Sequence, residues 1–274
     1  MRHPSHLSRC FFAFLLSLLV LSFPALAMES PLTQAERDFA ADGALPAACS
    51  ESVLGSLAAE AVRTVCGTDL ARRPAGLCSG TREAGAVFES DLDRLFPQDT
   101  ALRTAQLSPA DLKNFLETGV SHLVTGEGDR IDPERSAWAG FPQTAGFAWE
   151  YDVSAPAGSR VLSIRFQGEE LALDDEGTQL TLTAPAALLD GSLGYPVFSF
   201  SDAGWTLREA LSRYLNSMDS ISPLGISSTV IGTASYPLSD RLPIAAVAAA
   251  CILIALISSI ARLKYNKHFT FQRN

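Results

Sequence analysis

Residues 139–164, AGFPQTAGFAWEYDVSAPAGSRVLSI, decide the fold because apolar and polar side chains alternate through most of this stretch. Residues 147–153 place Phe, Trp, Tyr and Val on one face of an extended chain. Residues 162–166 repeat the pattern with Leu, Ile and Phe after a turn rich in Pro, Gly and Ser. A period of two residues is typical of strands with one buried face. The stretch therefore predicts neighbouring strands of a half-buried antiparallel sheet.

Helical patterns flank these strands on both sides. Ser52 to Val65 has apolar side chains at helical spacing, and Gly67 can end that helix. A second helix is expected from Ser108-Pro109, a favourable N-cap and first helical residue. A third follows the capping box that Thr206 and Glu209 form. With a turn at residues 174–177 before a further strand, the sequence predicts an α+β fold, a mixed sheet with flanking helices.

Several segments around this stretch have the order and spacing of one known family. The sequence ESVLGSL at 51–57 is followed by CGTDL at 66–70, GAVFESDL at 85–92, a helix at 107–120 and GYPVF at 194–198. Together with WTLREALSRYLNSMDSISP, these segments resemble the C-terminal, substrate-binding domain of the 5'-nucleotidase and UDP-sugar hydrolase family. The resemblance covers residues 49–225. Nothing before it resembles the metal-bearing catalytic domain of that family.

The resemblance implies that a loop of the type Asn-Gly-Gly-Gly-Ile-Arg helps bind the substrate, with the arginine reaching its anionic group. Aligned without gaps, the loop here is residues 74–79, PAGLCS, so Pro74 replaces the asparagine and Ser79 replaces the arginine. Arg82 lies three residues on and is the candidate substitute, but a solvated loop arginine is the favoured interpretation of this residue.

The family also implies a nucleobase held between two aromatic rings. One ring belongs to Leu-Pro-Phe-Gly-Asn, for which this chain has FPQDT at 96–100, so Phe96 supplies a ring only if the alignment slips locally. The other belongs to Gly-Gly-Asp-Gly-Tyr, which appears as GSLGY at 191–195 and keeps Tyr195. A ribose-binding aspartate is expected near Ser201 or Asp202.

Catalysis in the family uses two metal ions held by the N-terminal domain. Between the two apolar ends of this chain there is one histidine, His122, for which a surface position near a helix end is the expected role. We therefore expect no catalytic residues, no metal and no cofactor, and a chain that is not an enzyme by itself.

Three cysteines lie in the segment expected to face an oxidising compartment: Cys49, Cys66 and Cys78. Cys49 and Cys66 flank a helix of about 21 Å, which exceeds the roughly 7 Å limit between bridged Cα atoms. The chain after Cys66 should run back along the helix and bring Cys78 toward Cys49. We therefore predict a Cys49–Cys78 disulfide.

Both ends of the chain carry targeting signals. Residues 1–27 are typical of a signal peptide, with an A-x-A cleavage site at 25–27. Leu242 to Ala261 is an uncharged run long enough to span a bilayer, and the tail 262–274 is basic and should stay cytoplasmic. A GPI signal is the less favoured alternative, because such signals end in their apolar segment. Residues 28–48 are then an N-terminal extension and residues 226–241 a linker.

The net charge of the segment between the two apolar ends limits the classes of partner that we expect it to bind. All 30 acidic residues and 15 of the 21 basic residues lie in 28–241, which gives this segment a net charge of −15. Binding to nucleic acid is therefore not expected. The single predicted span makes the chain a single-pass membrane protein whose domain faces a periplasm or the cell exterior.

Two functions from different classes remain. In the first, the chain is a membrane-anchored, non-catalytic binding module whose partner is a separately encoded metallophosphatase. In the second, it retains weak nucleoside or nucleotide binding through Tyr195 and assists nucleotide breakdown.

Overall fold

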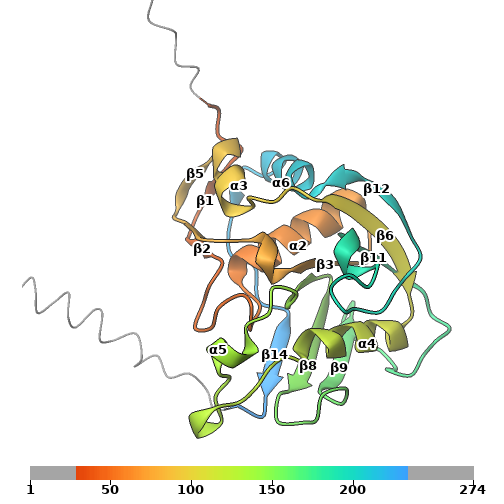
Figure 1. Ribbon diagram of the computed structural model, residues 1–274. Coiled ribbons are helices and arrows are strands. Elements are labelled where there is room, and N and C mark those ends of the chain that lie inside the picture. Colours follow the sequence, from red (N-terminus) through yellow and green to blue (C-terminus); the bar gives the residue numbers. More distant parts are fainter. Residues whose placement is uncertain (1–28, 234–274) are drawn as a thin grey trace, which may run out of the picture.

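The computed structural model describes residues 29–233, which form α-helices, short 3₁₀ turns and β-strands (Figure 1). The α-helices are α2 (Val53–Cys66), α3 (Glu89–Leu95), α4 (Pro109–Val120), α5 (Pro133–Ser136) and α6 (Leu207–Asn216), and the 3₁₀ turns are η1 (Ala75–Leu77), η2 (Glu127–Asp129) and η3 (Ala186–Leu188). The strands are β1 (Thr33–Ala35), β2 (Phe39–Ala40), β3 (Leu70–Pro74), β4 (Thr81–Arg82), β5 (Gly85–Val87), β6 (Ala101–Leu107), β7 (Pro142–Ala145), β8 (Phe147–Asp152), β9 (Val161–Phe166), β10 (Glu169–Glu170), β11 (Leu180–Pro185), β12 (Phe200–Thr206), β13 (Ser220–Ile221) and β14 (Ser228–Ile231). The predicted α+β class is confirmed.

A five-stranded sheet with the order β12-β6-β11-β3-β7 forms the centre of the fold. Strands β3 and β11 run parallel, and the other neighbouring pairs are antiparallel. Helices α2 and α4 lie on opposite sides of β3 (Figure 1). Ala71 of β3 packs into the same apolar cluster as Leu54 and Leu57 of α2. A Cβ on Gly119 of α4 would come within 3.0 Å of Arg72, the next residue of β3.

A second sheet with the order β10-β9-β8-β14 contains strands from the alternating stretch 139–164. Strands β8 and β9 are antiparallel, with Phe147 opposite Phe166, as the alternating pattern predicts. Strand β14 pairs with β8 in parallel, from Ser228 opposite Trp149 to Ile231 opposite Asp152. Residues 228–231 were expected to belong to a linker, so this boundary is corrected. The pattern missed the strand because two of its residues, Val230 and Ile231, are more than a third exposed and show no buried face.

The expected N-terminal extension is also part of the fold within its described residues. Strand β1 lies between β5 and β13, and β2 pairs with β4. Phe39 of β2 is buried against the cluster that surrounds α2. Residues 33–40 therefore supply strands to two small sheets, and the folded unit begins before residue 49.

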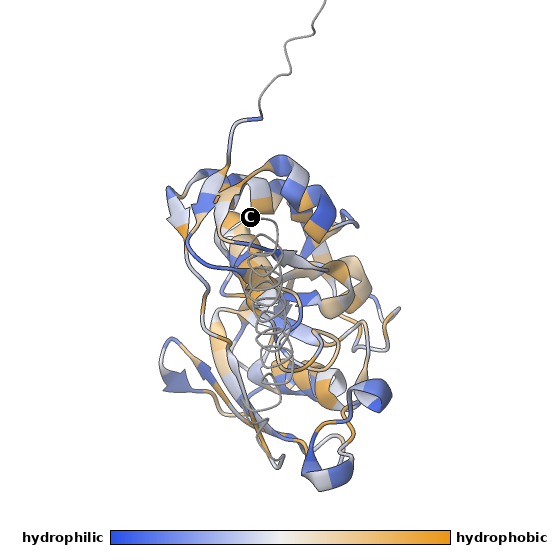
Figure 2. Ribbon diagram, turned by 90° about the vertical axis from the view of Figure 1, so that its left-hand side faces the viewer, coloured by the Kyte–Doolittle hydropathy of each residue, from blue (hydrophilic) through white to orange (hydrophobic). Residues whose placement is uncertain are grey.

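The helix boundaries follow the predicted caps. Ser52 accepts a hydrogen bond from the Gly55 amide, and Gly67 ends α2 with φ of 66°, a conformation that glycine adopts without steric cost. Ser108 caps α4, and Thr206 forms the expected capping box with Glu209 at the start of α6. Hydrophilic and hydrophobic residues are interspersed along the helices in Figure 2, as expected for amphipathic helices with one apolar face.

The core consists of two apolar clusters, one containing Phe115 and Tyr195 and the other containing Phe96 and α2 residues. None of the helices within residues 29–233 combines the length and the apolar character needed to traverse a bilayer. The predicted signal peptide, residues 1–27, and the predicted span, Leu242 to Ala261, lie outside the described residues.

Candidate functional site

Tyr195, the aromatic residue retained from the family motif, is buried. Its side chain is 3% exposed. The preceding turn contains Gly191 and Gly194, both with positive φ, and directs the ring toward the core. The Tyr195 hydroxyl donates a hydrogen bond to the Gly140 carbonyl at 2.8 Å and accepts one from Arg72.

Three side chains surround the Tyr195 ring. The Arg72 guanidinium carbon lies 4.0 Å from the ring centroid, Trp138 stacks at 5.2 Å, and Phe115 packs edge-on at 4.8 Å. His122 in turn stacks on Trp138 at 4.1 Å, so the stack reaches the exposed surface at its imidazole. The protein itself therefore fills the space beside the one stacking ring that the sequence clearly retained.

Arg72 carries the positive charge of this cluster. It is 1% exposed, and its guanidinium also lies 4.2 Å from the Phe115 ring centroid. Burial lowers the pKa of Arg72, while the Tyr195 hydroxyl and the Glu51 carboxylate oppose that change. Burial raises the pKa of Tyr195, and the neighbouring Arg72 charge opposes this shift.

Phe96, the second candidate ring, lies on the other side of the sheet. It is 1% exposed, and the guanidinium carbon of Arg73 is 5.1 Å from its centroid. Consecutive residues of a strand point to opposite faces, and Arg72 and Arg73 are consecutive in β3. Since Arg72 contacts Tyr195 and Arg73 contacts Phe96, the two rings lie on opposite faces of the sheet and form no sandwich.

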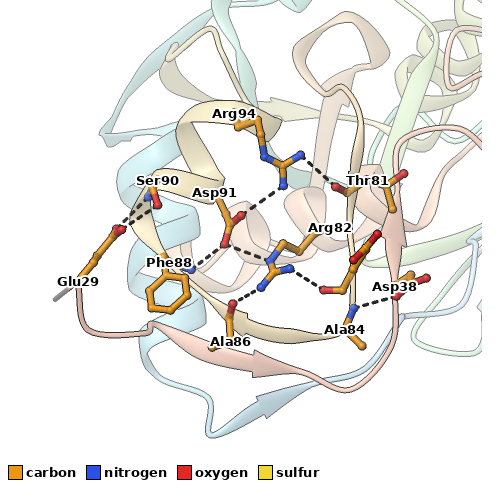
Figure 3. Close-up of polar contacts among 11 residues, drawn as sticks. Glu29, Asp38, Thr81, Arg82, Ala84, Ala86, Phe88, Ser90, Asp91 and Arg94 are labelled. Atoms are coloured by element: carbon orange, nitrogen blue, oxygen red, sulfur yellow. Dashed lines mark hydrogen bonds and ion pairs between the residues drawn. The ribbon is translucent and has the colours of Figure 1, made fainter.

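Arg82, the candidate anion-binding arginine, is engaged in structural contacts (Figure 3). Its Nε lies 3.1 Å from an Asp91 carboxylate oxygen, and its terminal nitrogens donate to the carbonyls of Glu83 and Ala86. Asp91 also accepts from the Phe88 amide at the start of α3. Arg82 thus joins the β4–β5 turn to α3 rather than lying free in a solvated loop.

Asp202, the candidate ribose-binding residue, forms a cross-strand pair. Its carboxylate accepts a hydrogen bond from Arg103 of β6 at 2.7 Å and another from the Gly204 amide. Ser201 lies beside it, opposite Thr104 in the same ladder. The structure therefore places Tyr195, Phe96, Arg82 and Asp202 in four separate environments.

The three cysteines within residues 29–233 are free thiols, so the predicted Cys49–Cys78 disulfide is not formed in this structure. The Cys49 thiol faces the Pro133 carbonyl, whereas the Cys78 thiol faces that of Ala75. The chain does return along α2 through β3, as expected, but the two thiols point to different neighbours. Burial, with smaller contributions from Asp132 and Asp42, raises the pKa of Cys49 to about 11.

Sequence reasoning missed the two buried arginines of β3. The pattern LARRP at 70–74 contains two charges beside apolar residues, and all five positions are buried. Consecutive residues of a strand face opposite sides, so both arginines are buried only because both faces of β3 are covered. Charged residues are rarely buried, so the sequence alone gives no signal for this pair.

Sequence reasoning also missed Glu51. This buried carboxylate accepts hydrogen bonds from the Thr144 and Ser228 amides and from the Thr144 and Ser227 hydroxyls. It joins the start of α2 to β7 and β14. No sequence pattern marks it, because its partners lie more than 90 residues away.

A metal-binding cluster and an open groove are two further kinds of site to consider in the described part of the chain. Among residues 29–233, no three His, Cys, Asp or Glu side chains lie close enough together to hold a metal ion. An open groove of about 850 Å³ runs along α6 and the end of α2, and it is lined by residues including Trp205, Arg208 and Arg213. None of the four candidate residues lines it.

Comparison with known proteins identifies the family to which this chain belongs. The family model of the 5'-nucleotidase C-terminal domain matches residues 32–199, and the chain belongs to this family. The match begins within the segment that was expected to be an extension, in agreement with the pairing of β1. A comparison with curated proteins finds no match.

Solved structures share the fold. A 5'-nucleotidase precursor from Thermus thermophilus is 23% identical with a TM-score of 0.63, over 82% of this chain and 44% of that chain. The NAD nucleotidase of Haemophilus influenzae is 17% identical with a TM-score of 0.61, over 85% of this chain and 42% of that chain. The sulfate thiohydrolase of Thermus thermophilus is 22% identical with a TM-score of 0.56, over 83% of this chain and 39% of that chain. This chain therefore spans less than half the length of these structures.

Proposed function

We propose that this chain is a membrane-anchored, outward-facing domain that binds a protein partner and does not hydrolyse nucleotides by itself. One observation carries the proposal. The Tyr195 ring is buried and enclosed by Arg72, Trp138 and Phe115, so it offers no face to a nucleobase. The fold of a substrate-binding domain is retained while the position of its ligand is filled from within.

The anchored topology of the proposal rests on the ends of the sequence. Residues 1–27 supply the secretion signal and residues 242–261 the membrane span, followed by the basic tail. The domain then lies outside the cytoplasm, in a periplasm or at the cell exterior. The proposed partner is a separately encoded metallophosphatase, because the similar structures are more than twice as long as the part that this chain matches.

A second function, weak binding of a nucleoside or nucleotide, is favoured by the presence of Tyr195 at the end of GSLGY. A base could stack on Tyr195 only after Trp138 or Arg72 moved away. Ligand-dependent stabilisation distinguishes the two functions, because a ligand that binds only the folded state raises the melting temperature, Tm.

The experiment is a thermal melt of the purified full chain with millimolar AMP, adenosine or a UDP-sugar. We expect no change in Tm, and no phosphate release from AMP when divalent metal ions are added. A rise of several degrees that Trp138→Ala enhances and Tyr195→Phe retains would show the second function instead. The proposed partner is tested by crosslinking the full chain in its native membrane. We expect a metallophosphatase to be recovered with it.

A further inference from the structure

The open groove along α6 is lined by side chains suited to a protein segment. It has a volume of about 850 Å³, and its lining includes the half-buried Trp205 ring, the buried Tyr214 and the arginines Arg208 and Arg213. Tryptophan, tyrosine and arginine are the residue types that carry most of the binding energy in protein interfaces. The groove is therefore a candidate docking surface.

The charged side chains of this groove are not balanced. Arg208 is already paired, because its Nη1 atom lies 2.9 Å from a carboxylate oxygen of Asp93, which is not part of the lining. Arg213 has no ion pair with the described residues and lies over the Trp205 ring, with its guanidinium carbon 5.4 Å from the ring centroid. The lining also contains three exposed carboxylates, those of Glu89, Asp99 and Glu209. Three anionic groups therefore accompany one unpaired cation.

Each of these carboxylates keeps one oxygen available to a ligand. The other oxygen accepts an internal hydrogen bond, from the Ser212 hydroxyl to Glu89, from the Arg208 amide to Asp99 and from the Thr206 amide to Glu209. The remaining oxygens have no hydrogen-bond partner among residues 29–233. The groove thus offers acceptors to a positively charged donor, beside an aromatic ring on which a guanidinium already lies.

The position of the groove suits the proposed partner, and this step rests on the proposed function. Glu29, the first described residue, accepts hydrogen bonds from the Ser90 amide and hydroxyl at 2.9 and 2.7 Å, so the chain enters the domain next to Glu89. The family model describes a C-terminal domain, so the additional length of the similar structures precedes the matched part, whose beginning lies on this side. Helix α6 lies at the opposite end of the domain from the C-terminal end of β14, after which the proposed membrane span follows (Figure 1). A partner bound at α6 would therefore be clear of the membrane.

We infer that this groove receives a positively charged, arginine-bearing segment of the partner protein. A guanidinium can donate two hydrogen bonds to one carboxylate and can also stack on the Trp205 ring, whereas the ammonium of lysine is a point charge. The net charge of −15 over residues 28–241 adds a long-range attraction for a cationic surface. Helix α6 has 10 residues and is about 15 Å long, which matches about five residues of an extended chain.

The test uses a synthetic peptide, Arg-Gly-Arg-Gly-Arg with both ends capped, and the full chain purified in a nonionic detergent at low ionic strength. The groove variant combines three changes that remove the charges and keep an oxygen acceptor for each internal hydrogen bond: Glu89→Gln, Asp99→Asn and Glu209→Gln. The control variant removes equal charge from exposed residues outside the groove: Glu169→Gln, Glu170→Gln and Glu176→Gln. We expect the Kd of the peptide to rise at least about tenfold in the groove variant and less than about twofold in the control.

A second measurement needs no variant. Carbodiimide labelling modifies exposed carboxylates of the wild-type chain, and the peptide should protect the three groove carboxylates but not the three control carboxylates. Absence of peptide binding, an equal rise in Kd in both variants, or equal protection of both sets would overturn the inference. A Lys-Gly-Lys-Gly-Lys peptide that binds as tightly would contradict the assignment to arginine and to stacking on Trp205.

Crosslinking in the native membrane separates this inference from the proposed function. Recovery of a metallophosphatase with the control variant but not with the groove variant would support the groove as its docking surface. Equal recovery with both variants would overturn the inference and leave the proposed function standing. If the peptide binds in the groove but no metallophosphatase is recovered with any of the three proteins, the proposed partner is wrong and the cationic site stands.

Discussion

Tyr195 and Arg72 stabilise each other inside the core, because burial of either polar group without the other would cost free energy. The hydroxyl accepts from the guanidinium and donates to Gly140, so both its hydrogen-bonding roles are used. A buried donor that loses its acceptor costs about 1–3 kcal/mol. The pair therefore contributes to the stability of the fold.

Tyr195→Phe should lower the free energy of unfolding by about 1–3 kcal/mol, because it keeps the ring but removes one of the two acceptors of Arg72, the other being the Gly140 carbonyl. Urea denaturation followed by tryptophan fluorescence measures the change. Tyr214→Phe is the control, since Tyr214 is buried but its hydroxyl makes no hydrogen bond to the described residues. Equal losses in both variants would contradict a specific role for the Tyr195 hydroxyl.

Cys49 makes stability depend on pH in the alkaline range. Its pKa is raised from 9.0 to about 11, so the unfolded chain ionises at a lower pH than the folded one. The thiol therefore stabilises the folded state fully below pH 9, and this contribution is lost as pH rises from about 9 to about 11.

We expect the wild-type chain to lose up to about 2–3 kcal/mol of its free energy of unfolding over this pH range through Cys49 alone. Cys49→Ala should show a smaller decline, caused by the Cys66 thiol and the buried Tyr151 and Tyr195, because burial raises their pKa values as well. Urea titrations at pH 7.5, 9 and 10.5 under reducing conditions make the comparison. Parallel curves for the two proteins would rule out the effect.

At the scale of elements, Glu51 fixes the last described strand. Its carboxylate reaches Ser227 and Ser228 at the start of β14 and Thr144 of β7. Glu51→Gln exchanges one acceptor oxygen for a donor that faces other donors. The variant should lose about 2–3 kcal/mol of stability, more than a typical neutral hydrogen bond, because charged partners are involved.

Hydrogen exchange checks this prediction locally. In Glu51→Gln, the amides of residues 228–231 should lose protection before those of α6. Glu150→Gln is the matched control, because Glu150 lies on β8 beside β14 and faces away from this network. Uniform loss of protection throughout the domain would mean that Glu51 supports the whole fold and not this strand in particular.

Elements with local signals were predictable from the sequence. The capping residues Ser52, Ser108 and Thr206 start helices as expected, and the alternation in 147–166 forms β8 and β9. Strand β14 was not predictable, because it pairs with a strand distant in sequence and its exposed Val230 and Ile231 show no buried face. The separation of the candidate residues has a related reason: matching motifs gives positions in sequence but not the face of the sheet on which a ring lies.

At the scale of the whole molecule, the testable feature is attachment to a membrane. A chain truncated after residue 241 loses the proposed span and keeps every described residue. We expect the full chain to sediment with membranes and resist carbonate extraction, and the truncated chain to appear in the soluble fraction outside the cytoplasm. Protease added to intact cells or spheroplasts should digest the domain. Retention of the truncated chain in the membrane would argue against Leu242 to Ala261 as the anchor.

The parallel pairing of β14 with β8 has a mechanical consequence. Residues 234–274 continue from the end of this strand, so any tension on the domain through that part of the chain is applied to β14. A pull along the strand axis loads the hydrogen bonds from Ser228 to Ile231 together, as in shear, and does not open them one after another. The contacts of Glu51 at the far end of the strand add to that resistance. A tether attached through that segment, as proposed, would load these bonds together and not one at a time.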